Sequence, residues 1–298
     1  MDDETTTYPL SDRDVFARRI GEWRPKLHRY CARMTGSVID GEDVLQEAIV
    51  KALDGFVAAS PIANPEGWLS RIAHNTVLDF LRRRARQRGA HADEDPDMVA
   101  DTEEIPDREV AAASLHTFMR LPPSQRSSVI LMDVLGYSLR EIGDVIELTV
   151  PAVKAALHRG RARLREIAAE PDDRPLPALR TGDRERLIRY VERFNARDFD
   201  AVRDMLADDV RLDLVNRARR EGKRDVSDYF TNYDRVGDWE FTPGFIDRRP
   251  AILVRNPELP QERPAYFVLL EWTGGRVFNI RDFRYASYVA DEAEVIAL

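Results

Sequence analysis

The sequence predicts a multidomain protein in which helical domains come first and an α+β domain follows. Three observations predict this fold class. Residues 121–165 carry a helix-turn-helix pattern, Asn64-Pro65 starts an earlier helix, and late strand-like segments flank Thr273-Gly274-Gly275. The length of 298 residues is enough for two or three domains.

The helix-turn-helix pattern is the most specific of the three. Ser138, with Glu141 three residues later, forms a capping box before a short amphipathic helix. After a turn, Thr149 can cap a second helix that has Pro151 in its first turn. Cations are expected to crowd the outer surface of this second helix: Lys154, His158, Arg159, Arg161, Arg163 and Arg165. A basic amphipathic helix more often simply exposes its charged face to solvent. Here the caps and the tight turn favour a helix that binds in a DNA major groove.

Two more helices are predicted upstream, after a first helix that we expect to kink or break at Pro25. Residues 40–47 open one of them with carboxylates in its first turn, as the helix dipole favours. Its apolar face leaves four polar side chains outside: Asp43, Gln46, Glu47 and Lys51.

The next helix begins with the cap Asn64 and with Pro65 at its first position, and it runs to about residue 86. We expect Trp68, Ile72, Leu78 and Leu81 on its inner side, and Arg71, Asn75, Thr76, Asp79, Arg82 and Arg83 on or near an outer face. Aromatic, amide and guanidinium groups together suit single-stranded or melting DNA. A core helix with a basic end explains the same pattern about as well.

Composition limits the function further. The net charge of −8 is unusual for a DNA-binding protein, but the basic and acidic residues are separated along the chain. Residues 81–88 hold five arginines and no acid, whereas residues 91–109 are strongly acidic. The single cysteine, Cys31, excludes an intrachain disulfide and a thiolate metal cluster, and no metal or cofactor is expected. The absence of a signal peptide or of a long apolar run favours a cytoplasmic location.

Two linkers divide the chain. Residues 91–108 form an acidic flexible linker, and the proline-containing residues 170–182 form a second one. The domains are therefore expected at 11–90, 109–169 and 183–298. In the last of these, a helix over 184–206 and a helix over 226–233 precede strands that end in a hairpin at Gly274-Gly275.

Residues 11–168 resemble the bacterial extracytoplasmic-function (ECF) sigma factors of the sigma-70 family. The resemblance rests on the acidic motif at 40–47, on Asn64-Pro65 through Trp68-Leu69 to Arg84, and on Leu121-Pro122, Gly136-Tyr137-Ser138 and Val153-Lys154. It implies a region 2 helical bundle, a region 4 helix-turn-helix, and a role in promoter-specific transcription initiation without catalysis by this chain. The sequence departs from the family pattern at Gly41, Gly143, Ala155, Ala156 and Gly160.

The same resemblance implies the partners and their sites. Core RNA polymerase would meet Asp43, Gln46, Glu47 and Lys51. The minus-ten element would meet Trp68, Arg71, Asn75, Asp79, Arg82 and Arg83, and the minus-35 element would meet Lys154, His158, Arg159 and Arg161.

Residues 183–298 are similar to the cone-shaped SnoaL-like domains of the nuclear-transport-factor-2 (NTF2) superfamily, through Glu221-Gly222-Lys223 and the late strand at 277–285. In ECF sigma factors such a domain implies a fused regulator in intramolecular contact with the sigma domains. Two alternatives stay open: a DNA-binding regulator, and a SnoaL-type enzyme or small-ligand domain fused to a degenerate sigma-like region. An enzyme would need an acid or base among residues such as Asp213, Asp247, Glu271 and Asp282, because every histidine precedes this domain.

Overall fold

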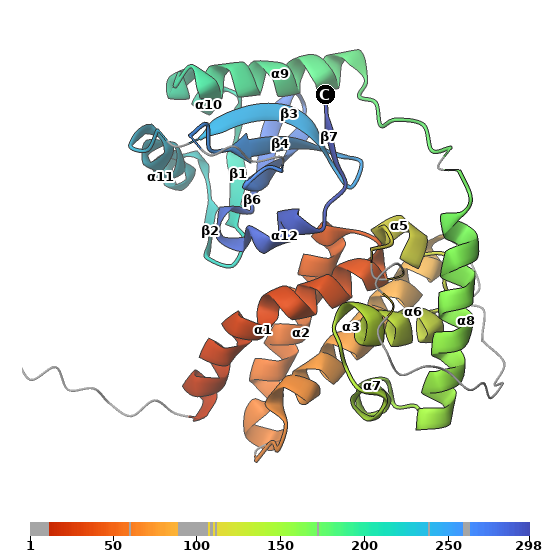
Figure 1. Ribbon diagram of the computed structural model, residues 1–298. Coiled ribbons are helices and arrows are strands. Elements are labelled where there is room, and N and C mark those ends of the chain that lie inside the picture. Colours follow the sequence, from red (N-terminus) through yellow and green to blue (C-terminus); the bar gives the residue numbers. More distant parts are fainter. Residues whose placement is uncertain are drawn as a thin grey trace, which may run out of the picture. The chain divides into compact units, whose positions relative to one another are not determined.

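The structure is a computed structural model that describes residues 12–59, 61–88, 107, 110, 112–171, 173–237, 239–258 and 263–298. The chain forms two compact units, Met1–Asp172 and Asp173–Leu298. The first unit is helical and the second contains a mixed sheet with helices, so the predicted fold class is confirmed (Figure 1).

Three long helices form the first part of the helical unit: α1 (Asp12–Thr35), α2 (Val38–Ala59) and α3 (Pro65–Arg88). Helix α1 is continuous through Pro25, so the predicted break there is wrong. Gly36 ends α1 with a positive φ of 76°, a conformation that favours glycine. A Cβ on Gly41 would lie 2.6 Å from the Ala32 backbone, so glycine permits the close packing of α1 against α2.

Shorter helices follow in the described part of this unit: α5 (Leu115–Phe118), α6 (Pro123–Val129), the π-helix η1 (Ile130–Val134), α7 (Leu139–Ile146) and α8 (Val150–Ala168). The capping box of α7 is present, because Ser138 and Glu141 each accept a backbone N–H from the other. Thr149 accepts a hydrogen bond from the Ala152 amide and caps α8. One hydrophobic core runs through the unit from α1 to α8.

Gly160 lies where α8 crosses α6. A Cβ there would be 2.7 Å from Val129 Cγ2, so glycine is required by close helix packing although it weakens an isolated helix. Ala155 and Ala156 are also buried within the helical unit. These departures from the family pattern therefore serve the interior of the domain.

The second unit begins with α9 (Thr181–Asn195) and α10 (Phe199–Asp204). The single helix predicted over 184–206 is wrong, because Arg197 adopts a positive φ of 58° and separates the two helices. The strands are β1 (Leu206–Leu214), β2 (Ala218–Glu221), β3 (Glu240–Ile246), β4 (Arg249–Arg255), β5 (Tyr266–Thr273), β6 (Arg276–Asp282) and β7 (Val295–Ala297).

These strands form one sheet in the order β2-β1-β6-β5-β4-β3-β7. All pairs are antiparallel except β1 with β6, which is parallel. The β5–β6 turn is the predicted hairpin, with φ values of 58° at Gly274 and 79° at Gly275. Helix α9 packs on β3 and α11 (Lys223–Asp234) packs on β1, while η2 (Arg284–Ala286) and α12 (Tyr288–Asp291) contact β5.

Of the two predicted linkers, residues 91–108 lie outside the described residues except for Asp107. Residues 173–180 contain no helix or strand, and α9 starts at Thr181.

Candidate nucleic-acid interface

Helix α3 presents an exposed stripe along one side. Trp68, Arg71, Asn75, Asp79 and Arg82 follow one another at steps of three or four residues, so they share one face of the helix. The last four side chains are exposed, and Trp68 is half-buried against Phe16, with their ring centroids 5.9 Å apart.

The buried side of α3 differs from the prediction. Leu69, Ala73 and Val77 are fully buried, whereas the expected inner residues Ile72, Leu78 and Leu81 are only partly buried. Thr76 was expected on the outer face, but it is buried and its hydroxyl donates to the Ile72 carbonyl at 2.8 Å. Ala73, Thr76 and Val77 therefore lie on the buried side of α3, which contacts α1 and α2.

Several arginines near the end of α3 are engaged within the unit. Arg83 pairs with Glu47 at 3.2 Å and Arg84 pairs with Asp40 at 3.1 Å. Arg82 pairs with Asp79 on the exposed stripe at 3.3 Å. The first two ion pairs join α3 to α2, whereas the Arg82–Asp79 pair lies within α3.

Helix α2 carries the four predicted polymerase residues on its solvent side. Asp43, Gln46 and Lys51 are exposed, and Glu47 is partly exposed. Hydrogen bonds from Lys51, and then from Arg83, lower the pKa of Glu47 below its usual value despite partial burial.

Sequence reasoning missed Val50, which is 48% exposed among these polar residues. The signal was present, because Val50 lies off the apolar stripe of residues 45, 49, 52 and 56. Val50 therefore lies on the same solvent-facing side of α2 as the predicted polymerase residues.

The second helix of the helix-turn-helix, α8, presents Lys154, His158 and Arg159 with their side chains exposed or partly exposed. The predicted surface position of Arg161 is wrong: the side chain is buried in a bidentate ion pair with Asp133 of η1. A buried guanidinium with its N–H groups on a carboxylate has no free edge for a base, so Arg161 is a positioning residue for α8.

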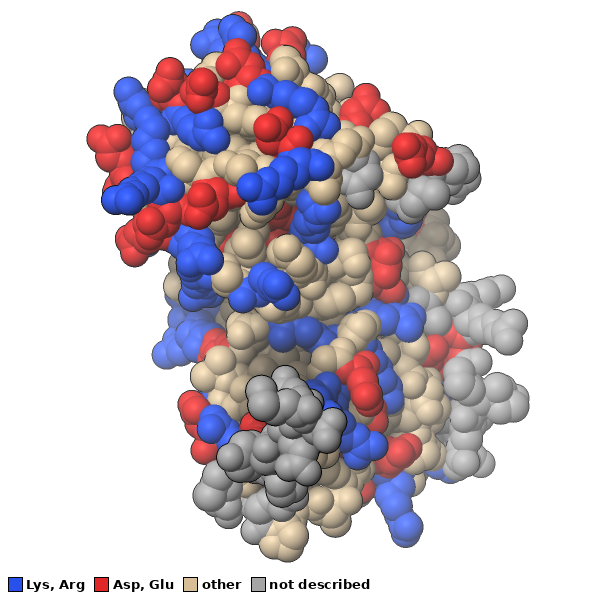
Figure 2. Space-filling model, turned by 90° about the vertical axis from the view of Figure 1, so that its left-hand side faces the viewer, with Lys and Arg blue, Asp and Glu red and all other residues tan. Residues whose placement is uncertain are grey.

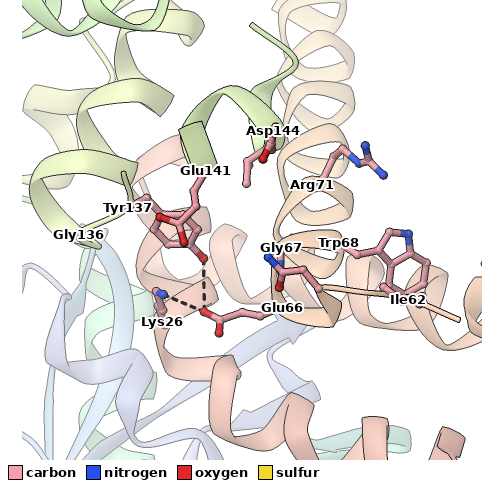
Figure 3. A pocket seen from close by; sticks show the side chains of 12 residues that line it. Lys26, Ile62, Glu66, Gly67, Trp68, Arg71, Gly136, Tyr137, Glu141 and Asp144 are labelled. Carbon is pink, nitrogen blue, oxygen red and sulfur yellow. Dashed lines mark hydrogen bonds and ion pairs between the residues drawn. The ribbon is translucent and has the colours of Figure 1, made fainter. Parts of the chain in front are cut away.

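A cavity of about 400 Å³ lies where α1, α3 and α7 meet. Figure 3 shows Lys26, Glu66 and Tyr137 converging on one side of it, with Trp68 and Arg71 on the other. Lys26 Nζ is 2.8 Å from a Glu66 oxygen and 4.2 Å from the centre of the Tyr137 ring. The cavity thus borders the N-terminal end of the exposed α3 stripe.

The second unit has an aromatic interior. Phe194 alone contacts Phe199, Phe230, Tyr233, Trp239 and Phe241 with ring centroids 4.2–6.0 Å apart. On the surface shown in Figure 2, acidic and basic side chains intermingle over the upper part of the molecule, with no separated positive patch there. This face offers no concentrated attraction for phosphate groups.

Among the described residues of that unit, the carboxylate of Asp282 is fully buried. Asp282 accepts hydrogen bonds from the hydroxyls of Tyr229 and Tyr233, both at 2.9 Å, and from the Arg284 amide at 2.8 Å. Burial raises the pKa of Asp282, although these hydrogen bonds oppose the rise.

The other three candidate acids or bases are not gathered with it. Asp213 pairs with Arg219 and Arg281, Asp247 accepts from the Glu294 amide, and Glu271 accepts from Asn279. Within the described part of the chain, no group of His, Cys, Asp or Glu residues could hold a metal ion. None of the described helices is long and apolar enough to cross a membrane.

Comparisons with known proteins agree with this arrangement. Residues 20–87 match the Sigma-70 region 2 family, residues 115–164 match Sigma-70 region 4, and residues 187–250 match the SnoaL-like domain. The ECF RNA polymerase sigma factor SigE of Mycolicibacterium smegmatis is 33% identical over 150 residues, which cover 49% of this chain and 58% of that protein. The chain thus spans little more than half the length of that relative.

This chain covers a larger share of two other proteins, one matched by sequence and one by structure. The ECF RNA polymerase sigma factor SigM of Mycobacterium tuberculosis is 33% identical over 157 residues, covering 52% of this chain and 78% of SigM. The crystal structure of the Mycobacterium tuberculosis extracytoplasmic function sigma factor SigJ is 19% identical, with a TM-score of 0.36, and covers 89% of this chain and 95% of that chain.

Proposed function

Because the chain belongs to the family of ECF RNA polymerase sigma factors, we propose that it binds bacterial core RNA polymerase and directs promoter-specific transcription initiation. The observation that carries the proposal is the exposed stripe of α3. It lies in the same unit as a helix-turn-helix whose two helices, α7 and α8, each have an N-cap. We propose sigma region 2 at 11–90, region 4 at 109–169 and the SnoaL-like domain at 183–298, with linkers at 91–108 and 170–182. We place the activity in the cytoplasm.

The polymerase contact is made by the solvent side of α2. Asp43, Gln46, Glu47 and Lys51 supply charges and hydrogen-bonding groups, and Val50 supplies an apolar centre. On the buried side of the same helix, Glu42 forms an ion pair with Arg24 of α1 at 2.5 Å, which links α2 to α1. Protein interfaces commonly combine an apolar centre with a polar rim.

The minus-ten contact is made by α3. Trp68 stacks on an unpaired base, Arg71 and Asn75 offer donors to base edges and backbone, and Arg82 and Arg83 attract phosphates. Stacking of about 1–3 kcal/mol per base helps to offset the melting of the duplex. Asp79 orients Arg82 through their ion pair.

The minus-35 contact is made by the exposed side of α8. Lys154, His158 and Arg159 face the major groove. On the buried side of α8, the Arg161–Asp133 ion pair holds the helix against η1. Arg161 is not among the base-contacting residues.

We propose that the SnoaL-like domain modulates this activity by intramolecular contact, and that the chain performs no catalysis. Two observations argue against an enzymatic role. Asp282 is buried with Tyr229 and Tyr233 as hydrogen-bond donors, and the other three candidate carboxylates have separate partners.

Reconstituted transcription tests the main proposal. The full chain, with core polymerase and a pool of promoter fragments, should give specific initiation, and a chain ending at Glu170 should give a different rate. A full-chain variant with Arg71→Ala and Asn75→Ala should bind core polymerase normally but initiate poorly. Absence of both initiation and core binding would refute the proposal and favour a DNA-binding regulator.

A further inference from the structure

The helical unit contains a second cavity, larger than the one beside Lys26. Its volume is about 670 Å³, within the range of about 300–1,000 Å³ that small-molecule sites occupy. Three stretches that are distant in sequence form its walls: residues 74–85 of α3, residues 119–127, and residues 146–148 at the end of α7. The cavity is therefore a product of tertiary packing, and no local pattern in the sequence indicates it.

Much of the wall of this cavity is apolar. Leu78 and Leu81 of α3 are only partly buried, and Leu148 is 36% exposed, so part of the wall is open to solvent. The larger apolar side chains that line the cavity are Leu78, Leu81, Met119, Leu121, Ile146 and Leu148. Walls of this kind accommodate the hydrocarbon or aromatic part of a ligand, which leaves water when it binds.

The charged side chains that line the cavity have one sign. They are Arg82, Arg84, Arg120 and Arg126, and the described lining residues include no Asp or Glu. The chain as a whole has a net charge of −8, so this local excess of cations is unusual within it. The cavity beside Lys26 and Arg71 differs, because three carboxylates also line it: Glu66, Glu141 and Asp144. A cleft lined by charge of one sign concentrates ions of the opposite sign.

Three of the four arginines already have a carboxylate partner outside the lining. These ion pairs are Arg82–Asp79, Arg84–Asp40 and Arg120–Glu170. Arg84 uses only its Nη1 in its pair, at 3.1 Å, and about a third of its side chain is exposed. Its other N–H groups can therefore donate to a ligand, and a guanidinium is a strong donor to a carboxylate.

Arg126 differs from the other three. It is 5% exposed, and no carboxylate of the described residues lies within ion-pair distance of it. Its guanidinium donates to the carbonyls of Met34 at 2.6 Å and Leu121 at 2.7 Å, and these groups carry no net charge. Burial lowers the pKa of Arg126 to about 10, so it remains a cation at neutral pH. A buried charge without a counter-ion is unfavourable, and an anion in the cavity would compensate it.

We propose that this cavity binds a small amphipathic carboxylate. The apolar body of the ligand lies against Leu78, Leu81 and Leu148, and its carboxylate accepts hydrogen bonds from Arg84 in the positive field of Arg126. The site lies in the helical unit, apart from the SnoaL-like domain. It goes beyond the proposed transcription function and does not depend on it.

Isothermal titration calorimetry of the full chain with decanoate, kept below the concentration at which it forms micelles, tests the proposal. Decanoate should bind saturably with one-to-one stoichiometry and raise the melting temperature. Decan-1-ol and decyltrimethylammonium have the same apolar body without the negative charge, and acetate has the charge without the body. Each of these three probes should bind about tenfold or more weakly than decanoate.

Two variants locate the site. Leu148→Glu adds a carboxylate to the cavity wall, so it should weaken decanoate binding about five- to tenfold without weakening that of decyltrimethylammonium. Leu176→Glu, at a leucine of the second unit that is 78% exposed, is the matched control and should leave decanoate binding unchanged. Ser124→Trp places a large ring at the cavity wall and should block decanoate and decan-1-ol alike.

A third variant tests the charge of the site. Arg126→Met should reduce the preference for decanoate over decan-1-ol about five- to tenfold, because it removes the buried cation. Circular dichroism and thermal melts show whether each variant is folded. If Arg126→Met does not fold, the comparison of Leu148→Glu with Leu176→Glu decides the proposal.

Three results would overturn the proposal. Decanoate could fail to bind saturably, or decyltrimethylammonium could bind as tightly as decanoate, which would contradict the expected selection of an anion. Binding of decanoate at full strength by both Leu148→Glu and Ser124→Trp would place it elsewhere on the protein. These titrations contain neither polymerase nor DNA, so their outcome is separate from that of the transcription assay.

Discussion

Arg161 and Asp133 form a buried bidentate ion pair, with Nη2 to Oδ1 at 2.5 Å and Nε to Oδ2 at 3.0 Å. Asp133 Oδ1 also accepts the Asp107 amide at 2.9 Å. The pair therefore ties α8 to η1 and to the segment that precedes region 4. Arg161, although it belongs to the basic helix, therefore stabilises the interior of the helical unit.

Arg161→Ala should destabilise the helical unit by about 3–5 kcal/mol, because it leaves the Asp133 carboxylate buried without its cation. The double change Arg161→Met with Asp133→Leu should recover much of this loss, since both charges are removed. Urea unfolding followed by circular dichroism measures the difference. Arg163→Ala, on an exposed side chain of the same helix, should change the stability by less than about 0.5 kcal/mol. A large effect of Arg163→Ala alone would contradict this assignment.

The free energy of unfolding of the helical unit should fall on acidification, because the pKa of His74 is lower in the folded protein than in the unfolded chain. Burial, and then the charge of Arg82, lower the pKa of His74 from 6.5 to about 4. The unfolded chain therefore binds more protons than the folded one between about pH 6.5 and pH 4, and the stabilisation present above pH 6.5 is lost as the pH falls through this window. The loss is about 3 kcal/mol.

Denaturant unfolding at several pH values measures this dependence. His74→Gln should flatten the stability profile between pH 4 and pH 6.5, whereas His158→Gln, at an exposed position on α8, should leave it unchanged. A profile for His74→Gln as steep as that of the wild type would count against His74 as the origin.

Gly160→Ala should destabilise the protein by about 1–3 kcal/mol, because the new Cβ meets Val129 Cγ2 at 2.7 Å in a packed helix crossing. Gly21→Ala is the matched control: no atom lies within 4 Å of its Cβ position in α1. That change should stabilise the protein by up to about 1 kcal/mol through helix propensity. Thermal melts of both variants test the contrast, and equal signs would contradict it.

Arg71→Ala and Asn75→Ala should each weaken binding of the polymerase complex to a single-stranded minus-ten fragment by about 1–3 kcal/mol. Both side chains are exposed, so protein stability should stay nearly constant. Fluorescence anisotropy with core polymerase and a labelled oligonucleotide measures the affinity. Arg18→Ala, an exposed arginine of α1, serves as the control, and an equal loss there would indicate a general charge effect.

Local chemistry determined much of this fold from the sequence. The Ser138–Glu141 box, the Thr149 cap, the Asn64 cap and the Gly274-Gly275 hairpin were predicted because each depends on residues adjacent along the chain, and all four are present. The polar residues of α2 and the stripe of α3 followed from helical periodicity in the same way.

Tertiary packing decided what periodicity could not. Arg161 lies on the basic helix, yet it is buried because Asp133, 28 residues earlier, supplies a carboxylate behind α8. Thr76 and Gly160 likewise contact neighbours that are distant in sequence, Lys51 and Val129. Spacing within one helix shows which residues share a face, but the partner that covers that face comes from elsewhere in the chain, so burial and ion pairing become known only when the helices are assembled.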